Sequence, residues 1–102
     1  MKTNTSETIT LLAADPVFTL TASKYTNVFG HLADYAFLTV RSGQINYSYD
    51  GTDPSATGHL LTDNQSIGME GADVIIGFKI KATADAVLYV TYENTQVVTA
   101  IT

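Results

Sequence analysis

The sequence contains no cysteine, and its basic residues are few. Without cysteine there is no disulfide framework, no thiolate zinc site and no cysteine nucleophile. Five Lys and Arg residues stand against ten Asp and Glu residues, so the net charge is −5. An excess of negative charge opposes contact with phosphate backbones, and the basic residues form no stripe. We therefore expect no nucleic-acid partner.

Long apolar runs are also absent. The longest apolar stretches are far too short to span a bilayer, so we expect no membrane partner. Residues 1–10 are polar and rich in threonine, and they lack the apolar segment of a secretory signal peptide. The expectation is a protein that is made in a cytoplasm and is used there or released by lysis.

Charge is sparse relative to apolar content. Charged residues make up 15% of the chain, against about 25% in an average globular protein, while the apolar fraction of 45% is ordinary. A chain of 102 residues suits one compact domain, here residues 1–102, with a modest core. Low charge indicates that another molecule covers part of the surface, and an oligomer is a reasonable expectation.

Apolar and polar residues alternate through most of the chain, which is the pattern of strands with one buried face. About seven to eight such segments, separated by turns, predict an all-β antiparallel β-sandwich or barrel. Residues 1–14 are expected to form an extended arm or an edge strand. The predicted strands cover residues 8–13, 17–22, 35–41, 44–49, 66–70, 74–82, 86–93 and 96–101.

Turn residues divide these segments. Ser42-Gly43 predicts a hairpin between two strands, and residues 83–85 predict a second turn. Residues 50–59 combine Asp, Gly and Pro and predict a long ordered loop. Residues 26–34 have neither strand nor helix spacing and are expected to be a loop.

No catalytic motif is present. A Ser-His-Asp site needs a serine held against a histidine that a carboxylate orients, and no motif places His31 or His59 beside a serine. An enzyme would require several polar side chains of one region to converge in a pocket, and we expect that they do not. The polar side chains in question are Ser48, Ser55, His59, Asp50 and Asp53.

Asp50 and Asp53 share one glycine-containing loop, and oxygen-rich loops suit calcium. The positions that should carry further ligands hold Pro54 and Ala56 instead. We therefore expect the two carboxylates to cap backbone amides of the loop, with no metal and no cofactor.

Tyrosines are the most informative side chains. Tyr47 and Tyr49 share a face with Ile45, and Tyr92 shares one with Leu88, so these three are expected to pack in or beside the core. Tyr89 lies on the opposite face and is the first candidate for contact with a partner. Asp50, Asp53 and His59, in the loop, are the other candidate interface residues.

Two stretches of the chain carry a family resemblance, namely residues 44–61, QINYSYDGTDPSATGHLL, and residues 78–92, FKIKATADAVLYVTY. Both resemble small β-rich head proteins of tailed bacteriophages. The resemblance is one of pattern, and it implies a jelly-roll-like β-sandwich on a capsid. It further implies a decoration or cement protein, commonly a homotrimer, that binds the major capsid protein and stabilises the contacts between capsid subunits.

That hypothesis places the protein on the capsid surface of a virion, after synthesis in the host cytoplasm. Two alternatives stay open: a neck or tail component of similar architecture, and a carbohydrate- or receptor-binding β-module. The β-module would use tyrosine and asparagine side chains on a sheet face, or the loop of residues 50–59.

Overall fold

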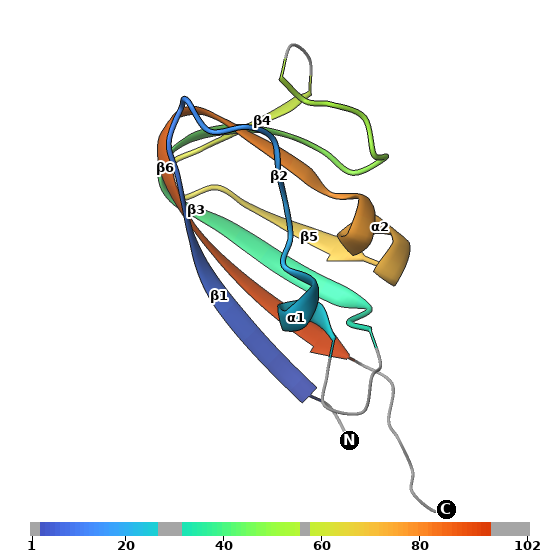
Figure 1. The fold of residues 1–102 in the computed structure, drawn as a ribbon. Coiled ribbons are helices and arrows are strands. Elements are labelled where there is room, and N and C mark those ends of the chain that lie inside the picture. The colour runs from blue at the N-terminus through green and yellow to red at the C-terminus, as the bar shows by residue number, and fades with distance from the viewer. Residues whose placement is uncertain (1–2, 27–31, 56–57, 95–102) are drawn as a thin grey trace, which may run out of the picture.

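The computed structural model describes residues 3–26, 32–55 and 58–94. Within these ranges there are six strands and two short helices, so the all-β prediction is confirmed, with fewer strands than expected. Neither helix of the described part could cross a bilayer, being too short. In chain order (Figure 1) the elements are β1 (Thr3–Leu11), β2 (Phe18–Thr19), α1 (Ala22–Tyr25), β3 (Tyr35–Ser48), β4 (His59–Thr62), β5 (Ser66–Glu70), α2 (Ala72–Gly77) and β6 (Lys79–Asn94).

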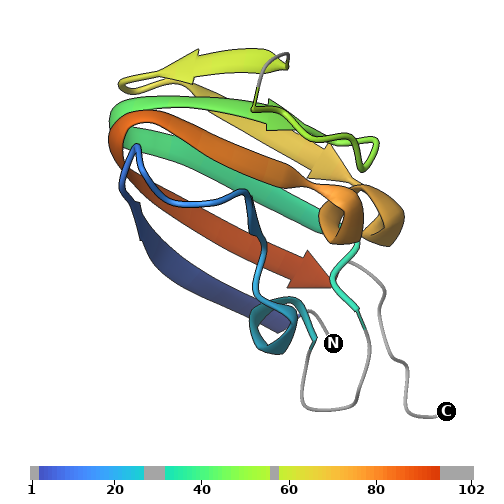
Figure 2. The same cartoon turned by 45° about the horizontal axis from the view of Figure 1, so that its top comes forward.

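All six strands belong to one antiparallel sheet, in which the long strands β3 and β6 are shared by two halves. In the β5 half the order is β1, residues 86–94 of β6, residues 35–42 of β3, and β5. In the β4 half the order is β2, the first part of β6, the last part of β3, and β4. The sheet bends back on itself between the halves (Figures 1 and 2).

The bend occupies the segment where a hairpin was predicted, and the hairpin prediction is wrong. β3 runs without interruption through Ser42 and Gly43, and its pairing with β6 shifts register between Val40 and Ile45. Gly43 has a φ of 90°, and a Cβ there would lie 2.1 Å from the carbonyl oxygen of Asp85. Only glycine allows this conformation together with so close an approach of β6.

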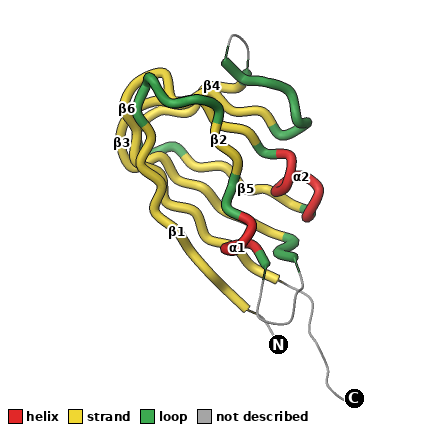
Figure 3. Tube along the Cα trace, in the orientation of Figure 1, coloured by secondary structure: helices red, strands yellow, loops and turns green. Residues whose placement is uncertain are grey.

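The second predicted turn, at residues 83–85, is wrong for the same reason. β6 continues through these residues from Lys79 to Asn94 and bends beside β3. The tube in Figure 3 shows the two strands turning together. Because both strands bend together and their pairing resumes at Gln44 with Ala84 and at Ile45 with Ala82, neither strand has to end there.

One hydrophobic core lies between the two halves. Alternate residues of β3 and β6 point inward, as the period-two pattern predicts, and nearly all of them are buried. Leu20, Met69 and Ile75 add side chains from the segments that flank the long strands. The fully buried large side chains include Leu38, Val40, Ile45, Phe78, Ile80, Leu88, Val90 and Tyr92.

Residues 72–77 form helix α2, which corrects the prediction of a strand over residues 74–82. The predicted inward face placed Val74 and Ile76 beside Phe78. In the structure Ile75 is buried while Ile76 is about half exposed. A run of adjacent apolar residues fits either secondary structure, and the packing of Ile75 into the core selects the helix.

The N-terminal third differs from prediction in a similar way. β1 is longer than expected and pairs with β6 along its whole length, at one edge of the sheet. β2 has only two residues of the predicted 17–22 strand, and α1 follows it. The predicted strand at 96–101 lies outside the described residues, as does most of the predicted 26–34 loop, where Thr26 and Leu32 form an isolated bridge.

Candidate functional site

Tyr89 lies at the centre of the outer surface of the β5 half. One row of paired residues crosses the four strands as Thr8, Tyr89, Thr39 and Ser66, and the next row crosses as Ser6, Thr91, Phe37 and Gly68. Thr10 and Val87 start a third row. We call these ten residues the Tyr89 face.

The Tyr89 face carries no Asp, Glu, Lys, Arg or His. Charge returns only at its borders, where Glu93, Tyr35 and Glu70 form the neighbouring row and Arg41 lies beside the bend. The outer surface of an antiparallel sheet normally faces water and carries charged residues. Interface cores, in contrast, are depleted of charge and enriched in aromatic residues.

Two aromatic rings project from this uncharged surface. Tyr89 and Phe37 are each 42% exposed, although both belong to central strands of the β5 half. Around them the hydroxyl groups of threonine and serine supply adaptable hydrogen bonding, and those of Thr39 and Ser66 lie 2.8 Å apart. A large apolar group ringed by small polar ones is typical of a binding surface.

A second aromatic feature runs from the core to the surface of the β4 half. The buried ring of Phe78 stacks on Tyr47 with a centroid distance of 5.2 Å, and Tyr47 lies 5.3 Å from His59. His59 in turn stacks on Tyr49 at 5.6 Å with the planes only 5° apart. Tyr47 is buried as predicted, whereas Tyr49 is 48% exposed. We call Tyr47, Tyr49 and His59 the aromatic ridge.

The loop beside the ridge is built by its two aspartates, as predicted. Asp50 accepts hydrogen bonds from the backbone N–H and the hydroxyl of Thr52, and Asp53 accepts one from the backbone N–H of Ser55. Hydrogen bonds from Thr52 and Ser55 favour the charged carboxylates and lower the pKa of Asp50 and of Asp53 below the ordinary value. Among the described residues, no cluster of three side chains suited to a metal ion is found.

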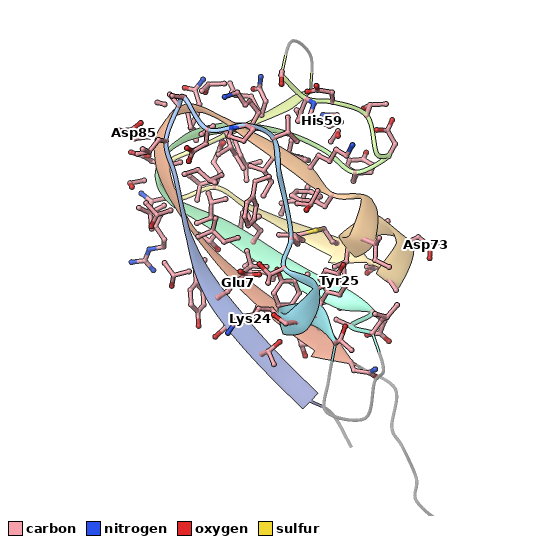
Figure 4. The ribbon with its side chains drawn as sticks, viewed as in Figure 1. Glu7, Lys24, Tyr25, His59, Asp73 and Asp85 are labelled. Carbon is pink, nitrogen blue, oxygen red and sulfur yellow. The ribbon has the colours of Figure 1, made fainter. Side chains whose placement is uncertain are left out.

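Two hollows share the aromatic ridge. The first, of about 250 Å³, is polar and is completed by Ser48, Asp50, Thr52 and Gly58. The second, of about 320 Å³, lies toward β5 and α2 and is completed by Ile67, Gly68, Met69, Glu70 and Val74. Figure 4 shows His59 on the loop side of the molecule, away from the bend that Asp85 marks.

The structure brings together some of the residues that sequence reasoning proposed. Asp50 and His59 line the polar hollow with Ser48, while Asp53 and Tyr89 line neither hollow. Ser48 is buried, and its hydroxyl donates to the carbonyl oxygen of Thr52.

Tyr49 and Phe37 were missed as surface residues. Tyr49 continues the inward alternation of Ile45 and Tyr47, but β3 ends at Ser48 and the alternation ends with it. The signal for this was the Asp-Gly turn directly after Tyr49. Phe37 stands opposite Leu38 in the alternation, and its outward position follows from the pattern alone.

Comparisons of the chain with protein-family models, with curated proteins and with solved structures found no match. The fold and the two surfaces described above are therefore the basis for any functional argument. They define an all-β domain with an uncharged aromatic sheet face and a separate aromatic ridge between two hollows.

Proposed function

We propose that this chain is a non-enzymatic assembly domain that binds protein through the Tyr89 face. The observation that carries the proposal is the absence of charge across two complete rows of four strands, with Tyr89 and Phe37 projecting from them. Covering this face with a protein surface removes two aromatic rings from water and leaves no charge without a partner. A solvated sheet surface needs no such composition.

The partner we propose is the major capsid protein of a tailed bacteriophage, on the outer surface of the capsid. This part rests on the resemblance of residues 44–61 and 78–92 to phage head proteins. A decoration protein that binds only the assembled lattice stabilises it by mass action. The jelly-roll-like sandwich and the homotrimer belong to the same proposal.

The size of the Tyr89 face supports a multivalent mode of binding. Four strands spaced about 4.8 Å apart, with rows about 7 Å apart, give a face on the order of 200–300 Å². A standard protein interface covers about 800 Å² on each partner. One face is therefore too small for tight binding by itself, and several copies or additional loop contacts are needed.

The test compares Tyr89→Ala with Leu60→Ala, two exposed side chains on different halves of the sheet, of which Leu60 lines neither hollow. Light scattering gives the solution mass of each variant, and co-sedimentation with expanded capsids of the encoding phage gives binding. We expect a trimer whose capsid binding falls at least about tenfold with Tyr89→Ala, a typical loss for a central aromatic contact, and changes little with Leu60→Ala. Equal binding by wild type and Tyr89→Ala would remove the Tyr89 face from the proposal.

The alternative is a carbohydrate-binding module, for which the specific observation is the exposed stack of Tyr49 on His59 beside Asp50. Such a module binds glycans as an isolated domain. A glycan array probed with the purified chain and with Tyr49→Ala tests it, and binding that depends on Tyr49 would favour the alternative over capsid assembly.

A further inference from the structure

The aromatic ridge lies between two carboxylates. Asp50 lines the polar hollow and Glu70 lines the hollow toward β5, while the rings of Tyr47, Tyr49 and His59 border both. Neither hollow is lined by Lys or Arg among the described residues. The two carboxylates beside the ridge thus have the same sign as the net charge of the chain, which is −5.

Asp50 is held in place by the residue two positions along the loop. The backbone N–H and the hydroxyl of Thr52 both donate to Oδ1 of Asp50. The Thr52 hydroxyl and N–H also fix the carboxylate in one orientation at the rim of the polar hollow. A carboxylate held in this way is a ready partner for a planar donor that can bond it from one side.

The rings supply the other half of a recognition site. Tyr49 and His59 are exposed at the outer end of a stack that is anchored in the core by Tyr47 and Phe78. Their positions are therefore fixed before any ligand binds, so little side-chain entropy is lost on binding. The face of a tyrosine ring attracts cations, and guanidinium groups stack on aromatic planes more readily than ammonium groups do.

We propose that the polar hollow binds an arginine side chain of a partner protein, which stacks on Tyr49 and forms hydrogen bonds to Asp50. A neutral sugar ring could also stack there, but the carboxylate of Asp50 in the polar hollow, that of Glu70 across the ridge and the lack of a lining Lys or Arg favour a positively charged occupant. The inference rests on the proposed function only in that the arginine belongs to a protein partner. It adds the chemistry of a second contact, separate from the Tyr89 face.

The test is a titration of the purified chain with N-acetyl-arginine amide, followed by NMR signals of the Tyr49 and His59 rings. The neutral control is N-acetyl-citrulline amide, which has nearly the same shape without the charge. We expect millimolar binding of the arginine compound, at least about fivefold weaker binding of citrulline, and weakening with added salt.

Matched variants separate charge from stacking. Asp50→Asn keeps the shape of the side chain and is expected to weaken arginine binding about fivefold, and Tyr49→Leu is expected to weaken it by a similar factor. Tyr89→Leu, on the other surface, is expected to leave it unchanged. Equal binding of arginine and citrulline, or binding of methyl glucoside in place of arginine, would overturn the inference. Because no capsid is used, this result is independent of the co-sedimentation result.

Discussion

Tyr92 donates a hydrogen bond from its buried hydroxyl to Oε2 of Glu7, at 2.5 Å, and so joins the inner faces of β6 and β1. Oε1 of the same carboxylate accepts a hydrogen bond from the hydroxyl of Thr21 at 2.9 Å. The ring of Tyr25, labelled in Figure 4 with Glu7, packs edge-on against Tyr92 with centroids 6.2 Å apart. The edge strand, the segment before α1 and the last strand therefore meet at one polar contact.

This contact makes stability sensitive to alkaline pH. Burial and the bond to Glu7 raise the pKa of Tyr92 above its ordinary value of about 10. The stabilisation is fully present below pH about 10 and is lost as the pH rises toward the raised value, since the unfolded chain releases the proton first. We expect Tyr92→Phe to cost about 1–2 kcal/mol near neutral pH and to reduce the alkaline loss.

Urea unfolding of wild type and Tyr92→Phe across the alkaline range measures this effect. Tyr89→Phe is the control, because Tyr89 is exposed and lies on the outer face of the same strand. If the two variants lose stability in parallel as the pH rises, the buried hydroxyl is not the source of the dependence.

The Asp50 loop is expected to respond at acid pH. The pKa values of Asp50 and Asp53 lie below the ordinary value of 3.8. The two charged carboxylates therefore contribute to stability above pH 3.8, and this contribution is lost as the pH falls through the lowered pKa values. Thr52→Val removes the hydroxyl donor and is expected to raise the pKa of Asp50 while leaving that of Asp53 in place. Carboxyl carbon shifts measured by NMR give both values, and an unchanged Asp50 would show that the hydroxyl has no part in the shift.

The bend at Gly43 predicts a large difference between two glycine substitutions. Gly43→Ala forces a Cβ to within 2.1 Å of the Asp85 carbonyl oxygen at a φ of 90°, and we expect a loss of more than about 3 kcal/mol. Gly51 has a similar φ of 85° but open space around it, so Gly51→Ala is expected to cost about 1 kcal/mol. Denaturant unfolding of both proteins separates crowding from backbone strain, and equal losses would exclude crowding as the cause.

Substitution of two adjacent isoleucines tests whether residues 72–77 form a helix. Ile75 is 1% exposed and Ile76 is 49% exposed, so Ile75→Ala is expected to cost about 2–4 kcal/mol and Ile76→Ala less than about 1 kcal/mol. A strand with Val74 and Ile76 inward predicts the reverse order. Thermal unfolding of the two variants therefore decides between the helix and the strand expected from the sequence.

Much of the core follows from the sequence, because alternation fixes which side chains face inward within a strand. Ile9, Leu38, Leu88 and Val90 are buried as their positions in the pattern predict. The predicted strand at Ser66–Glu70 has the bounds found in the structure. Tyr89 was also singled out from the alternation alone, and its exposure agrees with that position.

What could not be predicted depends on contacts between distant segments. Ser42-Gly43 has the composition of a hairpin turn, and only the presence of a second strand that bends beside it converts the turn into a bend. The short α2 forms because Ile75 packs into a core that the rest of the chain creates. The aromatic ridge and the hollows beside it likewise require β4 to pair His59 with Tyr47, which no local pattern specifies.

The pairing of β1 with β6 has a consequence for how the chain reaches its native state. Thr3 pairs with Asn94 and Leu11 with Ala86, so β1 has its only described strand partner in β6, about 80 residues further along the chain. Pairing over such separations requires closure of a long loop before any contact compensates for it, and folding of this kind takes milliseconds to seconds. A nascent chain must therefore keep the threonine-rich β1 unpaired until β6 has been synthesised.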